Sequence, residues 1–509
     1  MTWRQVQNLG AIATISIVAG TVSAQPKNVP FKPAIPKTWD EKALADWATP
    51  VAGLNVRPGH FSEEEYYRTP IHNYRTYPVY YPGREPAGYW DMLQKVGPQP
   101  LIEPGKLKTE ADWIEAGRQV FEQADVITVR RYDPKIVAAF HSLQEHQKAG
   151  SRPTPNGTLG NVRWVPTSEG LAISLTNCAP CHTRYEKDGR RINGPPPIAP
   201  GSLGSLGRLL FGGDHVAAAP IRIPGDAGMR RYRAFGVPWV KDDIHERLKL
   251  TASEGGGNDL GVTNGNGVFA RWNGSRYYPA RIPDLIGIKD RKYLDHTASH
   301  LNRGVEDLMR YAALVGYAES SDFGPYHMLT AEQRKIEGRL PDEALYALAL
   351  YIQSLKPPPN PNTPGADSAA GKKIFERERC TTCHTPGLYT NNKLTLALGF
   401  EPPPDRPSTL DILPLSVGTD PSLALKTRKG TGYYKVPSLK NIWYRHRLLH
   451  DGSIASLEEM FDPERLKDTH VPGGSRPAGV ETRAVIGHEF GLKLTPEEKK
   501  SLLVFLRTL

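Results

Sequence analysis

Cys178-Ala-Pro-Cys181-His182 and Cys380-Thr-Thr-Cys383-His384 are the two stretches that decide how this chain is organised. They contain all four cysteines of the 509-residue sequence, and each stretch ends in a histidine. Cys-x-x-Cys-His is the attachment string of c-type haem, in which each thiol bonds one vinyl group and the histidine becomes the proximal iron ligand. The sequence therefore predicts two covalently bound haem c groups, with His182 and His384 as iron ligands.

Three other uses of paired cysteines fit these strings less well. A dithiol redox site does not explain why a histidine follows both pairs. A zinc site with four cysteine ligands would have to join two strings that lie far apart in the sequence. Disulfides suit an oxidising compartment, but closely spaced pairs are poor staples for long loops. The doubled string favours haem.

The N-terminus has the features of an export signal. Arg4 precedes an apolar, small-residue run from Leu9 to Val22, and Val22-Ser23-Ala24 is suited to signal peptidase. Because the run is shorter than the ~20 apolar residues of a spanning helix, we expect residues 1–24 to be a signal peptide rather than an uncleaved anchor. The protein would then be periplasmic or secreted, with no transmembrane domain after signal removal.

The composition is that of a basic globular protein. The formal net charge is +10, the pI is about 9.2 and the mean hydropathy is −0.47. An exported protein is not expected to bind nucleic acid, so the basic surface is better suited to haem propionates and acidic redox partners. Because the charge is spread along the chain, a solvated basic face is the alternative.

The chain after residue 110 repeats itself. Gly117-Arg-Gln-Val-Phe121 resembles Gly371-Lys-Lys-Ile-Phe375, and each opens a helix ahead of its cysteine string. Ile282-Pro283-Asp-Leu-Ile-Gly-Ile288 resembles Val436-Pro437-Ser-Leu-Lys-Asn-Ile442, and the same register places Arg291 on Arg445 and His296 on His450. Residues 348–355 and 502–509 both have helical apolar spacing, with Tyr351 aligned on Phe505.

These patterns predict a mainly α protein built from two tandem cytochrome c-like helical domains with long irregular loops. The Pro- and Tyr-rich residues 25–110 form an irregular N-terminal extension, without a long helical period. The first domain covers residues 111–356, with an insertion over 122–177, and the second covers 367–509. A Pro-rich linker, 357–366, separates them.

The repeated domains resemble the bacterial di-haem cytochrome c peroxidase superfamily, which includes the MauG maturation enzyme. The residues that carry this resemblance are 436–442, Leu449-His450-Asp-Gly-Ser453 and Leu457-Glu-Glu459. Ser354-Leu-Lys-Pro-Pro-Pro-Asn360 and Gly487-His488-Glu-Phe-Gly491 look more like the branch of the RoxA-type rubber oxygenase. The resemblance covers about residues 110 to 509. It implies an oxidoreductase, and the likeness to peroxidases also suggests calcium between the domains.

The sixth ligand of the second haem is expected on the loop before the last helix. In the peroxidases this loop supplies a methionine, whereas here the neighbourhood reads Ala484-Val485-Ile486. His488 is the natural replacement, unless it is only a surface histidine. His450 is the runner-up ligand, although the resemblance implies a place beside the haem. Met460 and His470 are weaker candidates.

The first haem is expected to keep an open sixth site. Peroxidases place a distal histidine soon after this haem string, but Ile192–Ile198 contains neither histidine nor methionine. An open site needs a group that moves a proton, and the candidates are Glu254, Asp259, His215, His296 and His300; His296 is as well suited to supporting the haem edge. An apolar substrate pocket would draw on Phe269, Trp272, Tyr277 and Tyr278. Trp272 or Trp443 would bridge the haems, and Arg281, Arg291 and Arg445 would pair with propionates.

The sequence therefore predicts an exported di-haem oxidoreductase. The first haem would react with peroxide or dioxygen, or with an apolar organic substrate. The second haem would relay electrons from a small redox protein. Two alternatives stay open. One is an electron carrier in which both irons are six-coordinate, and the other is a subunit whose basic face docks on a larger complex.

Overall fold

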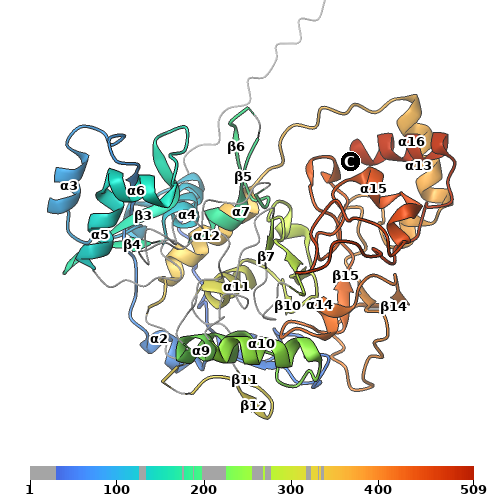
Figure 1. Ribbon diagram of the computed structural model, residues 1–509, viewed down its shortest axis with the longest axis horizontal. Coiled ribbons are helices and arrows are strands. Elements are labelled where there is room, and N and C mark those ends of the chain that lie inside the picture. The colour runs from blue at the N-terminus through green and yellow to red at the C-terminus, as the bar shows by residue number, and fades with distance from the viewer. Residues whose placement is uncertain are drawn as a thin grey trace, which may run out of the picture.

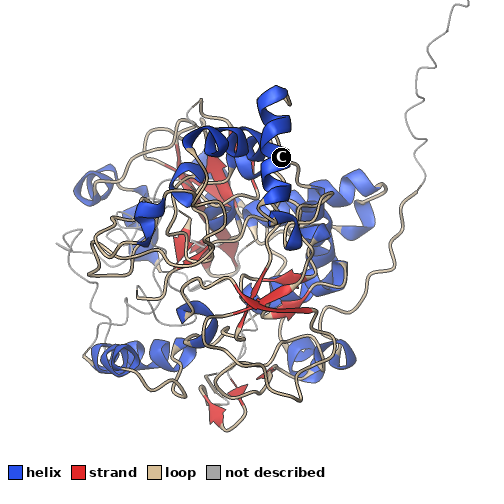
Figure 2. Cartoon of the chain, turned by 90° about the vertical axis from the view of Figure 1, so that its right-hand side faces the viewer, coloured by secondary structure: helices blue, strands red, loops and turns tan. Residues whose placement is uncertain are grey.

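The mainly α prediction is wrong. In the computed structural model, helices make up 35% and strands 14% of the chain, and several small sheets lie among the helices (Figure 2). The structure describes residues 30–124, 133–174, 177–186, 188–197, 225–254, 267–269, 277–316, 322–330, 332–333 and 338–509. The strands were missed because most have only two to five residues, too few for a period of two to stand out.

Two matching helix pairs frame the cysteine strings. Helix α4 (Glu110–Gln123) packs on α12 (Asp342–Ser354), and α13 (Ala366–Arg377) packs on α16 (Pro496–Arg507). A Cβ atom on Gly117 would lie 1.9 Å from the Ala347 carbonyl oxygen, and one on Gly371 would lie 2.0 Å from that of Ser501. Both crossings therefore need glycine, because the helix backbones touch there.

The aromatic rings at the two crossings also correspond. The centroids of Phe121 and Tyr351 are 5.5 Å apart at 60°, and those of Phe375 and Phe505 are 5.4 Å apart at 62°. These are edge-to-face contacts, which stabilise an aromatic pair beyond its buried area. The sequence repeat is thus preserved as a repeated packing arrangement.

Part of the N-terminal extension joins the insertion in a separate α/β unit. Strands β2 (Tyr77–Tyr80), β3 (Thr158–Thr167) and β4 (Gly170–Ser174) form an antiparallel sheet in the order β2-β3-β4. Helices α3 (Tyr89–Lys95), α5 (Pro134–His141) and α6 (Leu143–Ala149) accompany it (Figure 1). Val79, Phe140 and Trp164 lie in its own buried core. The expectation that residues 25–110 are irregular is therefore wrong for residues 77–95. Their strand was not predicted because its partner, β3, lies far along the chain.

Most of the remaining elements are short, apart from three helices of 11 or 12 residues. The helices are α1 (Glu41–Leu44), α2 (Glu63–Arg68), η1 (Pro104–Lys106), α7 (Ala179–His182), α9 (Gly225–Phe235), α10 (Asp243–Ser253), η3 (Ile288–Asp290), α11 (Val305–Gly316), η4 (Cys380–Thr382), α14 (Ser422–Leu425), η5 (Ile442–Tyr444), α15 (Leu457–Met460) and η6 (Pro463–Leu466). The strands are β1 (Pro58–Gly59), β5 (Thr183–Tyr185), β6 (Arg191–Asn193), β7 (Val268–Phe269), β8 (Ala280–Arg281), β9 (Tyr293–Leu294), β10 (His300–Leu301), β11 (Asp322–Phe323), β12 (Tyr326–His327), β13 (Leu394–Leu396), β14 (Ile412–Ser416) and β15 (Tyr433–Lys435).

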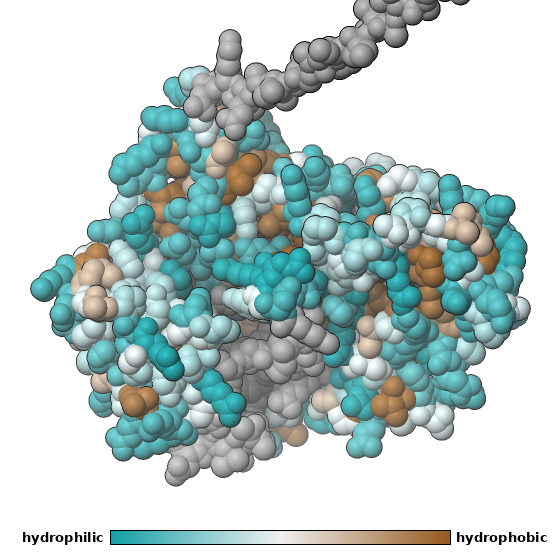
Figure 3. All heavy atoms as spheres, turned by 90° about the horizontal axis from the view of Figure 1, so that it is seen from above, coloured by the Kyte–Doolittle hydropathy of each residue, from teal (hydrophilic) through white to brown (hydrophobic). Residues whose placement is uncertain are grey.

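The two halves of the chain share their largest core. Leu394 and Tyr433, from the sheet β14-β13-β15, belong to the same buried cluster as Trp47, Leu301 and Leu345. The Pro-rich stretch after α12 runs across the top of the molecule to α13 (Figure 1). Seen from above, the described surface is mostly hydrophilic, with small scattered apolar areas (Figure 3). In the described part, none of the helices has the length and apolar character needed to cross a membrane.

Candidate haem centres

The first cysteine string lies at the start of α7 and leads into a hairpin. Cys178 is the N-cap of α7, and His182 ends the helix before β5 pairs with β6. Burial raises the pKa of the Cys178 thiol to about 12 and lowers the pKa of the His182 imidazole to about 4. His182 Nδ1 is buried and makes no hydrogen bond of ordinary geometry within the described residues, although the Pro283 carbonyl lies close by. The ring is therefore neutral, the form that binds metals.

The second string has the same chemistry in a tighter turn. Cys380 opens the 3-10 helix η4, and burial raises its pKa to about 11. His384 is 8% exposed, its Nδ1 lies 3.1 Å from the Tyr389 carbonyl oxygen, and burial lowers its pKa. A proton on Nδ1 directed at that carbonyl leaves Nε2 as the ligand nitrogen. The Pro437 carbonyl lies beside this ring as the Pro283 carbonyl lies beside His182.

The geometry does not favour the alternative uses of the cysteines. None of the four cysteines is part of a disulfide. Within the described residues, no group of three or more His, Cys, Asp or Glu side chains could hold a metal ion.

His488 lies opposite His384. The two ring centroids are 6.4 Å apart, with 56° between the ring planes. Imidazole–metal bonds are about 2.0–2.1 Å long, and the ring centre lies about 1.1 Å behind the nitrogen, so two rings on opposite sides of one iron have centres roughly 6.3 Å apart. Burial lowers the pKa of His488 to about 4, and its Nδ1 is buried without a described partner. The pair fits an iron between two neutral imidazoles.

The loop that carries His488 is held in an unusual conformation. Gly487 and His488 both have positive φ, 77° and 48°, and a left-handed φ is unfavourable for a histidine. The His488 amide donates to the Val417 carbonyl at 2.6 Å. Arg465 is fully buried, and its guanidinium donates to the carbonyls of Met460, Val485, Gly487 and His488. Arg465 could not be identified from the sequence, because its acceptors are backbone atoms.

The other candidate ligands of the second haem lie elsewhere. Met460 is in the buried core that α13 and α16 form. His470 Nε2 is 3.1 Å from Glu459 Oε1. His450 stacks on Tyr434 with centroids 4.2 Å apart, and its Nε2 lies 3.2 Å from the Tyr434 hydroxyl. Among the described contacts, the His384 ring pairs with that of His488 and not with that of His450 or His470.

The repeated motifs meet at a junction between the halves. The Arg281 amide donates to the His450 carbonyl at 2.8 Å, and the Lys435 amide donates to the His296 carbonyl at 3.0 Å. Lys435 aligns with Arg281, as His450 aligns with His296, so the two bonds are copies of each other. Such reciprocal contacts are those of an approximate two-fold axis. His296 Nε2 also lies 2.8 Å from the Arg281 carbonyl, so this histidine supports the junction.

Cations gather at this junction. Burial lowers the pKa of Arg281 and of Arg291 to about 10 each, and it lowers the pKa of Lys435 well below its usual value. Arg445 completes the set, with Nε 3.5 Å from Asp284 Oδ2. Arg184, from β5, donates to the Tyr444 carbonyl at 2.9 Å.

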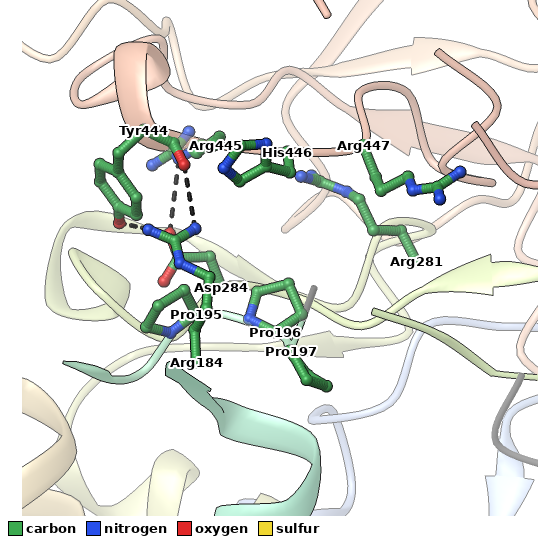
Figure 4. A pocket seen from close by; sticks show the side chains of 10 residues that line it. All are labelled: Arg184, Pro195, Pro196, Pro197, Arg281, Asp284, Tyr444, Arg445, His446 and Arg447. Carbon is green, nitrogen blue, oxygen red and sulfur yellow. Dashed lines mark hydrogen bonds and ion pairs between the residues drawn. The ribbon is translucent and has the colours of Figure 1, made fainter. Parts of the chain in front are cut away.

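A pocket opens beside these side chains. Figure 4 shows the prolines on one wall and residues of the second half on the other. It is lined by Arg184, Pro195, Pro196, Pro197, Arg281, Asp284, Tyr444, Arg445, His446 and Arg447. Lys435 could have been found from the sequence, because it aligns with Arg281 two residues before the shared proline.

Two of the catalytic candidates for the first haem, His215 and Asp259, lie outside the described residues, as does the aromatic candidate Trp272. Glu254 is exposed at the end of α10. His300 is buried between Trp47 and Tyr311, with ring centroids 4.2 and 5.5 Å away.

The described aromatic candidates Tyr277 and Tyr278 each contact a charged side chain. Phe269 ends the short strand β7. Tyr277 lies under the Arg247 guanidinium, and the Tyr278 hydroxyl donates to Asp242 at 2.6 Å. Trp443 packs in a small cluster with Ile192 and Ile286, so it does contact both halves.

Comparison with known proteins gives little beyond this geometry. No family model matches the chain, and no curated protein matches it. Among solved structures, a MauG-like protein associated with microbial copper homeostasis matches with 15% identity over 57% of this chain and 94% of the other, at a TM-score of 0.29. Hydrazine synthase from Kuenenia stuttgartiensis matches with 13% identity over 56% of this chain and 87% of the other, at a TM-score of 0.27. These likenesses are distant, and no role is assigned from them.

Proposed function

We propose that this chain is an exported di-haem c-type cytochrome oxidoreductase. Haem 2, attached at Cys380 and Cys383, is held between His384 and His488 and serves as an electron relay. Haem 1, attached at Cys178 and Cys181 and held by His182, is where peroxide or dioxygen reacts. The observation that carries the proposal is the pair of buried, neutral imidazoles with centroids 6.4 Å apart.

The two centres have different proposed roles because their surroundings differ. A haem iron with one open coordination position supplies peroxide or dioxygen chemistry, whereas one with two imidazoles supplies electron transfer. At haem 2 the Tyr389 carbonyl orients the His384 ring, and the loop with Arg465 presents His488. At haem 1 the stretch after the cysteine string has three prolines where a peroxidase has its distal histidine.

The surroundings of the protein follow from the same proposal. The signal sequence would bring the chain to the periplasm or outside the cell. Its electron donor would be a small redox protein, which a basic surface favours when the partner is acidic. The substrate is peroxide, dioxygen or, through dioxygen, an apolar organic compound.

The test is the ligand state of each iron in the full chain, produced in a host that attaches haem c. We expect two haems per chain, one low-spin signal from haem 2 and one high-spin signal from haem 1 that shifts with cyanide or carbon monoxide. His488→Ala should convert haem 2 to high spin. His470→Ala, a change at another histidine of the same half, should leave its spectrum unchanged.

The opposite results are equally clear. Two low-spin haems that ignore both ligands in every redox state would leave an electron carrier and remove the enzyme. A His488→Ala variant that keeps a two-imidazole spectrum would assign the ligand to another residue, with His450 the next to be replaced.

A further inference from the structure

The junction between the two halves contains more positive charge than the described protein groups neutralise. Arg281, Arg291, Lys435 and Arg445 all lie there, and each is partly buried, with 11% of the Arg445 side chain exposed. Arg291, Arg281 and Arg445 each lower the pKa of Lys435, and Arg445 also lowers the pKa values of Arg281 and Arg291. The four cations therefore form one electrostatic group.

Nearby carboxylates are mostly engaged with other cations. Asp295 is 3.3 Å from Lys429 Nζ, and Asp451 forms an ion pair with Arg483. Asp284 faces the group, but it also accepts a hydrogen bond from the Tyr444 hydroxyl. Among the described residues, Asp284 and the exposed Asp290 are thus the carboxylates left against four cations. Arg281 Nε is buried and makes no hydrogen bond to any described residue.

An uncompensated buried charge is unstable, so such a group indicates an anionic ligand. Guanidinium groups match the geometry of carboxylates, because two N–H donors meet two oxygens. The group also lies beside both candidate haem centres. Pro283, two residues after Arg281, approaches His182, and Pro437, two residues after Lys435, approaches His384.

We infer that this cation group is a single carboxylate-binding site shared by the two haems, which takes propionate groups of both. The inference rests on the proposed function. Lys435 is the residue it adds, as the counterpart of Arg281 in the second half. The main chain of each of these residues is bonded to the opposite half, so both halves build the site together. A charge change at either cation therefore acts on both haems.

The experiment measures the midpoint potential of each haem by spectroelectrochemistry in the full, haem-loaded chain. The variants are Lys435→Gln and Arg281→Gln, with Lys435→Met as a second variant that keeps the apolar stem. Lys440→Gln is the matched control, because Lys440 is exposed on the same segment. Lys435→Arg tests whether the charge alone is needed.

Removing a cation stabilises the ferric state, so Lys435→Gln, Lys435→Met and Arg281→Gln should each lower both midpoint potentials. Lys435→Arg and Lys440→Gln should leave both close to the parent value. A shift confined to one haem, or no shift, overturns the shared site. A shift of the parent protein's potentials on adding inorganic phosphate also overturns it. Phosphate would then exchange with the bound anion, which the propionate of a covalently attached haem cannot do. A purified parent chain without haem absorbance would instead refute the proposed function itself.

Discussion

Arg465 should decide whether His488 reaches the second haem. The Arg465 side chain is fully buried and donates to four backbone carbonyls, two of which belong to Gly487 and His488. Hydrogen bonds from a charged donor contribute about 1.5 kcal/mol each at the low end of their range. The two bonds to the His488 loop therefore supply about 3 kcal/mol, which is roughly a hundred-fold in the population of the docked loop.

The perturbation is Arg465→Met, which keeps much of the apolar stem and removes all the donors. We expect a mixture of low-spin and high-spin haem 2 in the electron paramagnetic resonance spectrum, with the high-spin fraction rising on mild warming. Arg465→Lys should restore part of the low-spin signal, since one ammonium can still reach some of the carbonyls. Arg476→Met, at an exposed arginine of the same half, is the control and should leave the spectrum unchanged.

The result that would refute this reasoning is specific. If Arg465→Met folds, shows normal circular dichroism and keeps a wholly low-spin haem 2, then Arg465 does not position His488. A merely structural arginine would lower the unfolding temperature without changing the spin state, so the two readouts separate the two roles.

Two further predictions concern stability. Gly371→Ala should destabilise the protein by about 1–3 kcal/mol, the usual range for overpacking, because the new Cβ would lie 2.0 Å from the Ser501 carbonyl oxygen; urea unfolding measures it, and Gly365→Ala, with open space around the new atom, is the control. An equal effect of both changes would contradict the close crossing of α13 and α16. Burial lowers the pKa of His60 from 6.5 to about 4, so between these values the unfolded chain binds more protons than the folded one. This contribution to stability is complete above pH 6.5 and is lost as the pH falls towards 4, by about 2 kcal/mol at pH 5. Between pH 7 and pH 5, the free energy of unfolding of His60→Gln should therefore fall by about 2 kcal/mol less than that of the parent. Identical pH profiles of the two proteins would contradict the burial of a neutral imidazole.

Much of the framework could be predicted from the sequence because it depends on local chemistry. Gly117 and Gly371 occur at matching places in two amphipathic helices, and the structure gives both the same close contact. His488 was proposed from a missing methionine, and the structure places its ring opposite His384. The assignment as an iron ligand, the domain boundaries and the signal peptide stay predictions.

What the sequence did not predict depends on partners that are distant in the chain. Strand β2 pairs with β3, whose residues come from the insertion, so neither segment predicts the sheet alone. Arg465 acts through backbone carbonyls, which leave no pattern in the residue types. Lys435 was visible in the alignment of the two halves, but its importance depends on burial next to Arg281.

The exchanged amide bonds at the junction, Arg281 to His450 and Lys435 to His296, have a mechanical consequence. A rigid rotation of one half about the other would break both main-chain bonds and expose the polar groups in them. These two bonds therefore oppose any change in the separation of the two Cys-x-x-Cys-His strings. Electron tunnelling between the centres would then proceed over a fixed gap, and its rate would respond to driving force rather than to domain motion.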